Sequence, residues 1–278
     1  ESMNNIPFYI RKARFGYRMG HNELEDGLIT ALSDPFTRAH MGTTAENIAE
    51  KYNITRDEQD KYALMAQKRA CRAVEKGLFK DEIVPITIKE RKKPDRIFDT
   101  DEHPRCSTSL EKLSKLKPAF RKDGTVTAGN ASGITDCAAV VLVMSSERAK
   151  ELNLRPKLRI IDSAVAGVPP DLMGIGPVPA VKKLLKKTGI KLNDIGLIEL
   201  NEAFASQTLY WLRELKLDIE KTNVNGSGIA LGHPIGATGA VLVVKIMHDM
   251  VRKNIKYGLV TMCIGGGQGM ATLFEMVK

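Results

Sequence analysis

The sequence predicts an α/β protein with a buried sheet, and two features of its second half carry that prediction. After Pro156, segments with the pattern of strands alternate with segments with the pattern of helices. The chain then ends in two apolar strands joined by a tight glycine turn. The first half is more irregular, so we expect a boundary near Pro156.

The composition is that of a globular protein. The chain has 278 residues, of which 43% are hydrophobic and 27% are charged, a balance that excludes an intrinsically disordered chain. No apolar run approaches the roughly 20 residues that span a bilayer. The start, Glu1-Ser2-Met3-Asn4, lacks an initiator Met and has neither the basic nor the apolar region of a signal peptide. We therefore expect a processed, split or truncated product.

The formal net charge of +9 admits three interpretations. Nucleic-acid binding is one, but aromatic residues make up only 5% and are not interleaved with the basic residues, as base stacking would require. An anionic small molecule, such as a nucleotide-bearing cofactor, accounts for the excess equally well. A solvated basic surface is the commonest cause of such an excess. We expect neither a nucleic-acid nor a membrane partner.

The four cysteines are scattered at positions 71, 106, 137 and 263. No CxxC pair is present, so we expect no metal site. A chain of this size does not need disulfides to stabilise its core. We therefore expect unpaired thiols and, from them, a reducing, cytoplasmic setting.

The first 90 or so residues combine loops with two helices. The expected elements are an irregular stretch over 1–41, a helix over about 39–51, a helix over 55–76, a strand over 83–88 and a basic surface loop over 91–96. The longer helix begins with the capping box Thr55–Glu58 and is closed by Gly77.

Small residues dominate 124–133, a composition that favours close approach of the backbone to a ligand over regular structure. The apolar run over 137–144 has the length of a buried strand, and Ser145-Ser146-Glu147 is expected to begin a short helix.

The regular second half contains four predicted strands and three predicted helices. The strands are expected over 158–165, 195–200, 258–263 and 269–277, and the helices over 177–187, 202–215 and 236–253. Proline at the start of the first of these helices and Gly189 just past its end support its bounds.

Three side chains lie in or beside bends of this half. Asn201 sits where a strand gives way to a helix, where its amide could donate to an oxyanion, although Asn there is ordinarily a helix cap. His233 lies between Gly232 and Pro234 in a loop suited to ligand contact, although a lone His is more often structural. Cys263 precedes a glycine run rich in free N–H groups, although a free Cys is usually a small buried hydrophobe. Together, an amide, an imidazole and a thiol suit carbon–carbon or acyl chemistry on a thioester.

A dinucleotide fingerprint over 226–232 is excluded. The third glycine comes one residue too late, and no apolar strand leads into the segment.

Taken together, these stretches resemble the C-terminal part of a thiolase, the acetyl-CoA C-acyltransferase family. The matching motifs are Asn201-Glu202-Ala203-Phe204, Gly232-His233-Pro234 and Cys263-Ile264-Gly265-Gly266-Gly267, with further matches over 40–47, 117–120, 127–133 and 173–177. The resemblance covers essentially the whole chain. It implies the layered α-β-α-β-α thiolase fold, with a loop (CoA-binding) domain at 1–134, a remnant of the N-terminal domain at 135–155 and a complete C-terminal domain at 156–278.

The resemblance also implies an activity in fatty acid metabolism. This is the reversible Claisen condensation of acetyl-CoA to acetoacetyl-CoA, or thiolysis of 3-ketoacyl-CoA, with coenzyme A thioester as substrate and no prosthetic group. His233 would activate a nucleophilic cysteine, Cys263 would carry a proton to and from the α-carbon, and Asn201 would hold a water in an oxyanion hole. The implied CoA and acyl pocket consists of Ser132, His40, Met41, Phe120, Ala128, Met173 and Phe204, with Arg105 and basic residues near Lys115 close to the nucleotide end.

The sequence departs from the family in one respect. The acylated cysteine of thiolases belongs to a segment that would precede Glu1, and neither Cys71 nor Cys106 has its context. We therefore expect a chain that is inactive and poorly stable alone, whose partner is the missing segment, and which is a dimer or tetramer when complete.

The alternative is a non-catalytic CoA-binding or assembly subunit with a thiolase fold. Retention of the amide, the imidazole and the thiol argues for the enzyme, since a binding protein needs none of the three. The acyl chain length stays open, because 263–269 favours the short-chain acetoacetyl type whereas 199–207 is as similar to the broader 3-ketoacyl type. The direction of the reaction also stays open.

Overall fold

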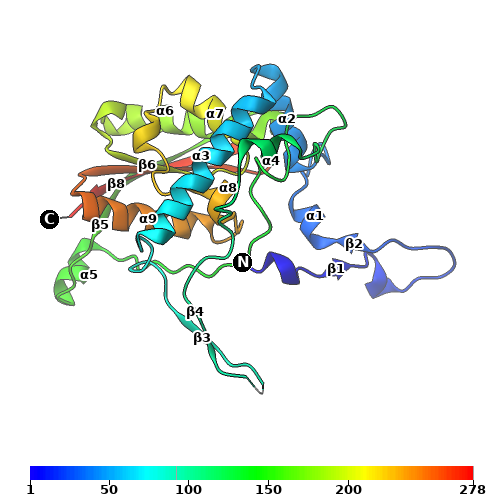
Figure 1. Ribbon diagram of the computed structural model, residues 1–278, viewed down its shortest axis with the longest axis horizontal. Coiled ribbons are helices and arrows are strands. Elements are labelled where there is room, and N and C mark those ends of the chain that lie inside the picture. The colour runs from blue at the N-terminus through cyan, green and yellow to red at the C-terminus, as the bar shows by residue number, and fades with distance from the viewer. Residues whose placement is uncertain (92, 278) are drawn as a thin grey trace.

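A computed structural model describes residues 1–91 and 93–277. Its centre is a four-stranded sheet in the order β5-β8-β7-β6 (Figure 1). The strands are β5 Leu158–Gly167, β6 Leu197–Leu200, β7 Tyr257–Ile264 and β8 Gln268–Met276. β6 and β7 are parallel, and the other two pairings are antiparallel. The predicted α/β fold is confirmed, and each of these strands lies where its pattern predicted it.

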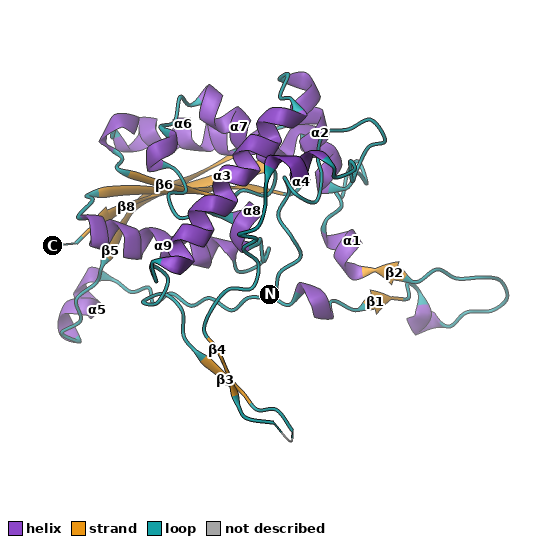
Figure 2. Ribbon diagram, viewed as in Figure 1, coloured by secondary structure: helices purple, strands orange, loops and turns teal. Residues whose placement is uncertain are grey.

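Helices cover both faces of this sheet (Figure 2). α6 Pro177–Thr188 and α7 Ala205–Glu214 lie on one face, and α9 Thr238–Lys253 lies on the other. The alternation along the strands explains this layering, because successive side chains point to opposite faces. Ile198 of β6 packs with α6 and α7, whereas its neighbour Leu197 packs with α9.

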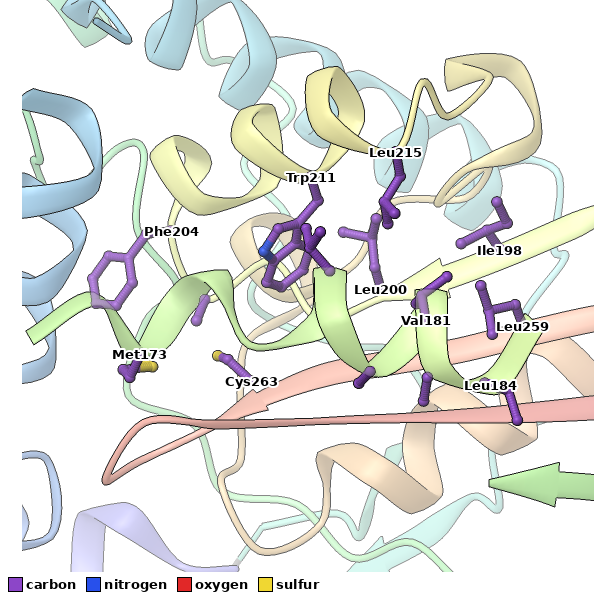
Figure 3. Close-up of a cluster of buried hydrophobic side chains, with 14 of the residues drawn as sticks. Met173, Val181, Leu184, Ile198, Leu200, Phe204, Trp211, Leu215, Leu259 and Cys263 are labelled. Atoms are coloured by element: carbon purple, nitrogen blue, oxygen red, sulfur yellow. The ribbon is translucent and has the colours of Figure 1, made fainter. Parts of the chain in front are cut away.

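The larger core cluster fills the space between the sheet and the α6–α7 layer. Figure 3 shows Trp211 of α7, and Leu215 just after this helix, on the side of Leu200 of β6. Met173, Phe204 and Cys263 lie together at one end of the same cluster (Figure 3). This end is where the apolar core meets the candidate site.

A third layer of helices packs against α7 and α8 Gly228–Leu231. α3 Arg56–Glu75 contacts both of these helices, and α2 Met41–Lys51 packs on α7 and on the 3₁₀ segment Pro170–Ile175. The predicted capping box of α3 is present, with both the Thr55 and the Glu58 side chains bonded to the backbone.

The glycine turn between β7 and β8 is required by two close approaches. Gly266 and Gly267 have φ of 81° and 88°, a region that favours glycine. A Cβ on Gly267 would lie 2.2 Å from the carbonyl oxygen of Val168, and one on Gly269 would lie 2.1 Å from the carbonyl carbon of Gly176. The turn therefore packs tightly against the backbone that leads into α6.

Two hairpin-like arms project away from the sheet (Figure 1). One pairs β3 Ile86–Ile88 with β4 Arg96–Phe98. The strand predicted over 83–88 is therefore shorter than expected. The basic loop predicted over 91–96 ends where β4 begins, and its Lys92 lies outside the described residues. The other pairs β1 Phe8–Tyr9 with β2 Glu25–Asp26. The remaining short elements are the helices α1 Gly27–Ala31, α4 Leu110–Ser114 and α5 Ser146–Glu151 and the 3₁₀ turns Met3–Asn5, Ala13–Phe15, Leu192–Asp194 and Ile219–Lys221.

The prediction of a buried strand over 137–144 is wrong. This segment has no strand partner within the described residues, and Val140 and Leu142 are 86% and 80% exposed. Apolar composition alone does not make a strand, because a strand needs a neighbour to satisfy its backbone groups. The short helix predicted after this segment is present as α5, capped by Ser145.

The prediction of four unpaired thiols is also wrong. Cys71 of α3 and Cys106 form a disulfide, whereas Cys137 and Cys263 are free. The two bonded residues are 35 positions apart, and the fold brings their Cα atoms to 5.6 Å. The disulfide removes the reason to expect a reducing setting, which depended on unpaired cysteines.

Neither a membrane-spanning helix nor a metal-binding cluster is present in the described part of the chain. Its helices are too short or too polar to cross a bilayer. No group of three His, Cys, Asp or Glu side chains is arranged to hold a metal ion there.

Candidate active site

The carboxyl ends of β6 and β7 bring two of the three predicted catalytic side chains together. Asn201 directly follows β6, and its N–H donates to the Thr261 carbonyl of β7 at 3.1 Å. Cys263 lies two residues further along β7, near its end. Because parallel strands end at the same edge of a sheet, the amide and the thiol emerge on the same side of the molecule.

His233 reaches the same edge from the loop between α8 and α9. Gly232 precedes it with φ of 93°, and a Cβ at that glycine would lie 2.2 Å from Thr135 Oγ1. Only glycine fits both the backbone conformation and the close contact. The imidazole then lies 3.2 Å from Asn201, measured from Nε2 to the amide Nδ2.

The second ring nitrogen of His233 fixes its tautomer. Nδ1 lies 2.7 Å from Thr238 Oγ1, and that hydroxyl donates its single hydrogen to the Pro234 carbonyl at 2.7 Å. Thr238 Oγ1 can therefore only accept from the ring, so Nδ1 carries the proton. Nε2 keeps its lone pair and accepts from the Asn201 amide.

Burial keeps this imidazole neutral. The pKa of His233 is lowered to about 4 because the charged ring would lose its hydration in the cavity wall. At neutral pH the ring is therefore free to accept a proton at Nε2.

The thiol of Cys263 is held in the protonated state by the same effect. Its residue is 7% exposed, and burial raises the pKa of the thiol to about 11, partly offset by a hydrogen bond from Gln207. The Gln207 amide nitrogen lies 3.5 Å from Sγ. The described hydrogen-bond partner of this thiol is therefore the side-chain amide of Gln207.

A cavity of about 460 Å³ adjoins these groups. Most of the predicted site residues line it: His40, Met41, Phe120, Ser132, Met173, Phe204, His233 and Cys263. Its other lining residues are largely apolar, and none of those described is a carboxylate, a lysine or an arginine. Such a wall suits an uncharged, partly apolar ligand segment.

Stacked rings shape one side of the cavity. The rings of His40 and Phe120 are stacked at 4.8 Å, and Phe204 meets Phe120 edge-on at 6.0 Å. His40 also caps α2, because its Nδ1 accepts from the Gly42 N–H at 3.0 Å. A Cβ at Gly42 would lie 2.3 Å from the Phe120 ring, so glycine is needed for the ring to reach the cavity.

Three predicted site residues lie outside this wall. Asn201 is completely buried behind His233 and reaches the site through its contact with the ring. Ala128 is exposed in the turn before Asn130. Arg105 is also exposed, and its backbone N–H donates to the Gln67 side chain at 2.8 Å.

Sequence reasoning missed the residues that support the site. Thr238 and Gln207 were not singled out, although a hydroxyl five residues after His233 at the start of a helix was a visible signal. Glu202 was quoted only as part of a motif, yet its buried carboxylate accepts from Tyr62 Oη at 2.7 Å and from Asn223 Nδ2 at 2.7 Å. These bonds attach α3 and the segment before α8 to the end of β6.

The hydrophobic lining from the first half was also missed. Leu28, Ile29, Ala31 and Leu32 of α1 and its C-cap line the cavity, together with Met3 and Ile134. No motif marks these positions, since they are ordinary apolar residues in an irregular segment.

Comparison with family models divides the chain in two. The model "Thiolase, N-terminal domain" matches residues 1–147, and "Thiolase, C-terminal domain" matches residues 154–276. The second match begins close to the boundary predicted near Pro156.

Individual proteins match over the whole chain. An acetyl-CoA acetyltransferase of Pseudomonas aeruginosa is 54% identical over 272 residues, which are 98% of this chain and 69% of that protein. The beta-ketothiolase BktB of Cupriavidus necator is 51% identical, covering 100% of this chain and 70% of that protein.

Solved structures give the same result. The crystal structure of the Bacillus anthracis acetyl-CoA acetyltransferase has a TM-score of 0.96 at 51% identity and covers 100% of this chain and 70% of that one. Human mitochondrial 3-ketoacyl-CoA thiolase in complex with CoA has a TM-score of 0.92 at 44% identity and covers 100% of this chain and 69% of that one.

Proposed function

This chain belongs to the thiolase family of acyltransferases, and on that premise we propose that its site forms and cleaves the carbon–carbon bond of acetoacetyl-CoA or another 3-ketoacyl-CoA. The observation that carries the proposal is that His233 and Cys263 line the same largely apolar cavity and that Asn201 contacts the His233 ring from behind it. The three groups come from three separate segments, the end of β6, β7 and the loop before α9, and a protein that only bound CoA would need none of them.

The proposed condensation begins at the methyl group of acetyl-CoA. When a second cysteine is acylated, the Cys263 thiol gives its proton to the CoA sulfur that leaves, which forms the Cys263 thiolate. This thiolate then takes a proton from the α-carbon of acetyl-CoA and becomes a thiol again, and the electron pair of the C–H bond passes into the enolate. Donors aimed at the thioester oxygen lower the cost of that charge. A water would be such a donor, and Asn201 would hold it, because its Oδ1 is buried without a hydrogen-bond partner in the described part of the chain and can accept from the water.

The carbanion then attacks the carbonyl of an acyl group held as a thioester on a second cysteine. The new carbon–carbon bond forms as the bond from that carbonyl to sulfur breaks, and the sulfur leaves as a thiolate. In the forward acylation, His233 Nε2 accepts the thiol proton of this second cysteine. Thiolysis runs the same steps in reverse.

We place the second cysteine outside these 278 residues. Cys71 and Cys106 are joined in a disulfide, and Cys137 is not among the described residues that line the cavity. The chain alone therefore does not turn over in this proposal, and it acts with a segment that supplies the acylated cysteine.

The substrate would be bound as a coenzyme A thioester, without a prosthetic group. Met41, Met173 and Phe204 offer an apolar surface for the acyl group and the pantetheine arm, and Ser132 offers a hydroxyl. The role of Ala128 in the CoA and acyl pocket and the role of Arg105 near the nucleotide end stay predictions. The domain boundaries at 134 and 155, the cytoplasmic location and the dimeric or tetrameric state also stay predictions.

A fusion tests the proposal. The part of the Pseudomonas aeruginosa relative that lies outside the matched 69% would be joined to this chain, and thiolysis of acetoacetyl-CoA would be followed by loss of substrate absorbance. We expect turnover by the fusion and none by the chain alone. Turnover by the chain alone, or a folded fusion that binds CoA without turnover, would contradict the proposal, and the second result would favour a CoA-binding subunit.

A further inference from the structure

The thiol of Cys263 has a buried amide behind it that no family motif assigns a role. Gln207 of α7 is completely buried. Its Nε2 lies 3.5 Å and its Oε1 lies 3.8 Å from Cys263 Sγ. Both ends of one amide therefore face the sulfur.

The backbone of Asn201 sets the orientation of this amide. Gln207 Nε2 donates to the Asn201 carbonyl at 3.4 Å, which only the nitrogen end can do. The two hydrogens of the nitrogen then have one target each, the carbonyl oxygen and the sulfur. The same side chain thus connects two of the three proposed catalytic residues.

Packing leaves the amide little freedom to turn away. A Cβ at Gly174 would lie 2.8 Å from Gln207 Oε1, so the glycine provides the space that the amide fills. The Gly174 carbonyl is itself fixed by the Trp211 indole, which donates to it at 2.5 Å. The amide is held against the sulfur by a rigid wall.

From this geometry we propose that Gln207 is a positioning residue for Cys263, donating to the sulfur when it is a thiolate and accepting from it when it is a thiol. The proposal rests on the proposed function of Cys263 as the group that exchanges the α-proton. A group that alternates between two protonation states needs a partner that can bond both, and a primary amide offers a donor and an acceptor in one plane.

The electrostatics of the surroundings make this partner important. The other titratable side chains that line the cavity are His40 and His233, and burial lowers the pKa of each, so both are neutral near pH 7. No described charged side chain lines the cavity to stabilise a thiolate. Against the effect of burial, the Gln207 hydrogen bond is the larger of two interactions that lower the pKa of the Cys263 thiol, the other being a bond to its own backbone.

The test measures alkylation of Cys263 by iodoacetamide in the 278-residue chain, with Cys137→Ser in every variant and the modified peptide identified by mass spectrometry. The rate at pH 9 is proportional to the thiolate fraction, which changes about tenfold for each pKa unit. Gln207→Leu removes the donor, and we expect alkylation roughly tenfold slower than in the parent. Gln207→Glu keeps the acceptor but adds a negative charge beside the sulfur, and we expect at least the same loss.

A matched control is Gln59→Leu. Gln59 is also completely buried, but its amide bonds the Ile54 carbonyl and the Thr125 hydroxyl away from the cavity. It should lose stability without changing the alkylation rate of Cys263. Should Gln207→Leu not fold, the isosteric Gln207→Glu variant carries the test.

Two results would overturn the proposal: a folded Gln207 variant alkylated at the parent rate, or an equal slowing in Gln59→Leu. Because alkylation needs neither CoA nor turnover, its outcome is separate from that of the fusion experiment. An inactive fusion with slowed alkylation in the Gln207 variants would refute the proposed function and leave the positioning of the thiol standing.

Discussion

Thr238 Oγ1 lies 2.7 Å from Nδ1 of His233 and donates a hydrogen bond to the Pro234 carbonyl. This pair determines which nitrogen of the imidazole faces the cavity as a base. The relationship is local, since the loop that carries His233 runs directly into α9, whose first residue is Thr238. A helix start therefore supplies the orientation of a base placed five residues earlier.

Replacing Thr238 by Val should reduce turnover of the fused enzyme. The valine is nearly isosteric but cannot accept from Nδ1–H, so the ring would lose its fixed tautomer. We expect kcat to fall on the order of tenfold to a hundredfold, with KM for acetoacetyl-CoA little changed. Thr238→Ser keeps the hydroxyl and should retain most of the activity. Equal losses in the two variants would mean that packing, rather than the hydrogen bond, is what matters.

The disulfide between Cys71 and Cys106 should contribute measurably to stability. Closing a loop across 35 residues limits the unfolded chain and is worth about 3 to 4 kcal/mol in the loop-entropy account. Urea denaturation of Cys71→Ser should show that loss, and adding dithiothreitol to the parent should reproduce it. Cys137→Ser is the control, because Cys137 is free, and should unfold at the parent midpoint. Detection of four free thiols in the folded, non-reduced chain would rule this prediction out.

Stability should fall as pH rises because of a buried acid outside the candidate site. Burial raises the pKa of Glu82 to about 8, partly offset by Lys245, whereas its ordinary value is 4.5. The folded state therefore binds a proton that the unfolded state releases near pH 4.5, so this contribution is present below that pH and is lost as pH approaches 8.

The comparison is between the parent and Glu82→Gln. Urea denaturation at pH 5 and pH 8 should show a smaller drop for the variant, by about 1.4 kcal/mol for each pH unit crossed between the two pKa values. Burial raises the pKa of Glu199 to about 7, although its partner Lys245 partly offsets the effect. The variant should therefore keep a smaller fall of stability with rising pH. Identical pH dependence in the two proteins would show that Glu82 titrates normally.

The second half of the fold could be predicted because its physical signals are local. A strand whose side chains alternate between two covered faces can be recognised from about a dozen consecutive residues. The same is true of the helix bounded by Pro177 and Gly189. The sequence directed attention to Asn201, His233 and Cys263 for a similar reason, and their catalytic roles stay predictions. Each lies next to a glycine, a proline or the end of a strand, and local sequence marks such positions.

The features that escaped prediction depend on contacts between distant segments. The run over 137–144 has strand composition, but whether it becomes a strand depends on a neighbour that its own residues do not specify. The pairing of Cys71 with Cys106 needs the path of the chain between them. The contact of Gln207 with Cys263 exists only because the fold places α7 over the end of β7.

The central claim is that Cys263 exchanges the α-proton of a CoA thioester, and deuterium uptake tests it most directly. The fused enzyme would be incubated with acetyl-CoA in D₂O, and loss of the methyl proton signal would be followed by NMR, with Cys137→Ala as the matched control. We predict exchange in the parent fusion and in the control, and at least a hundredfold slower exchange in Cys263→Ala. Exchange at the parent rate in a folded Cys263→Ala fusion would contradict the account.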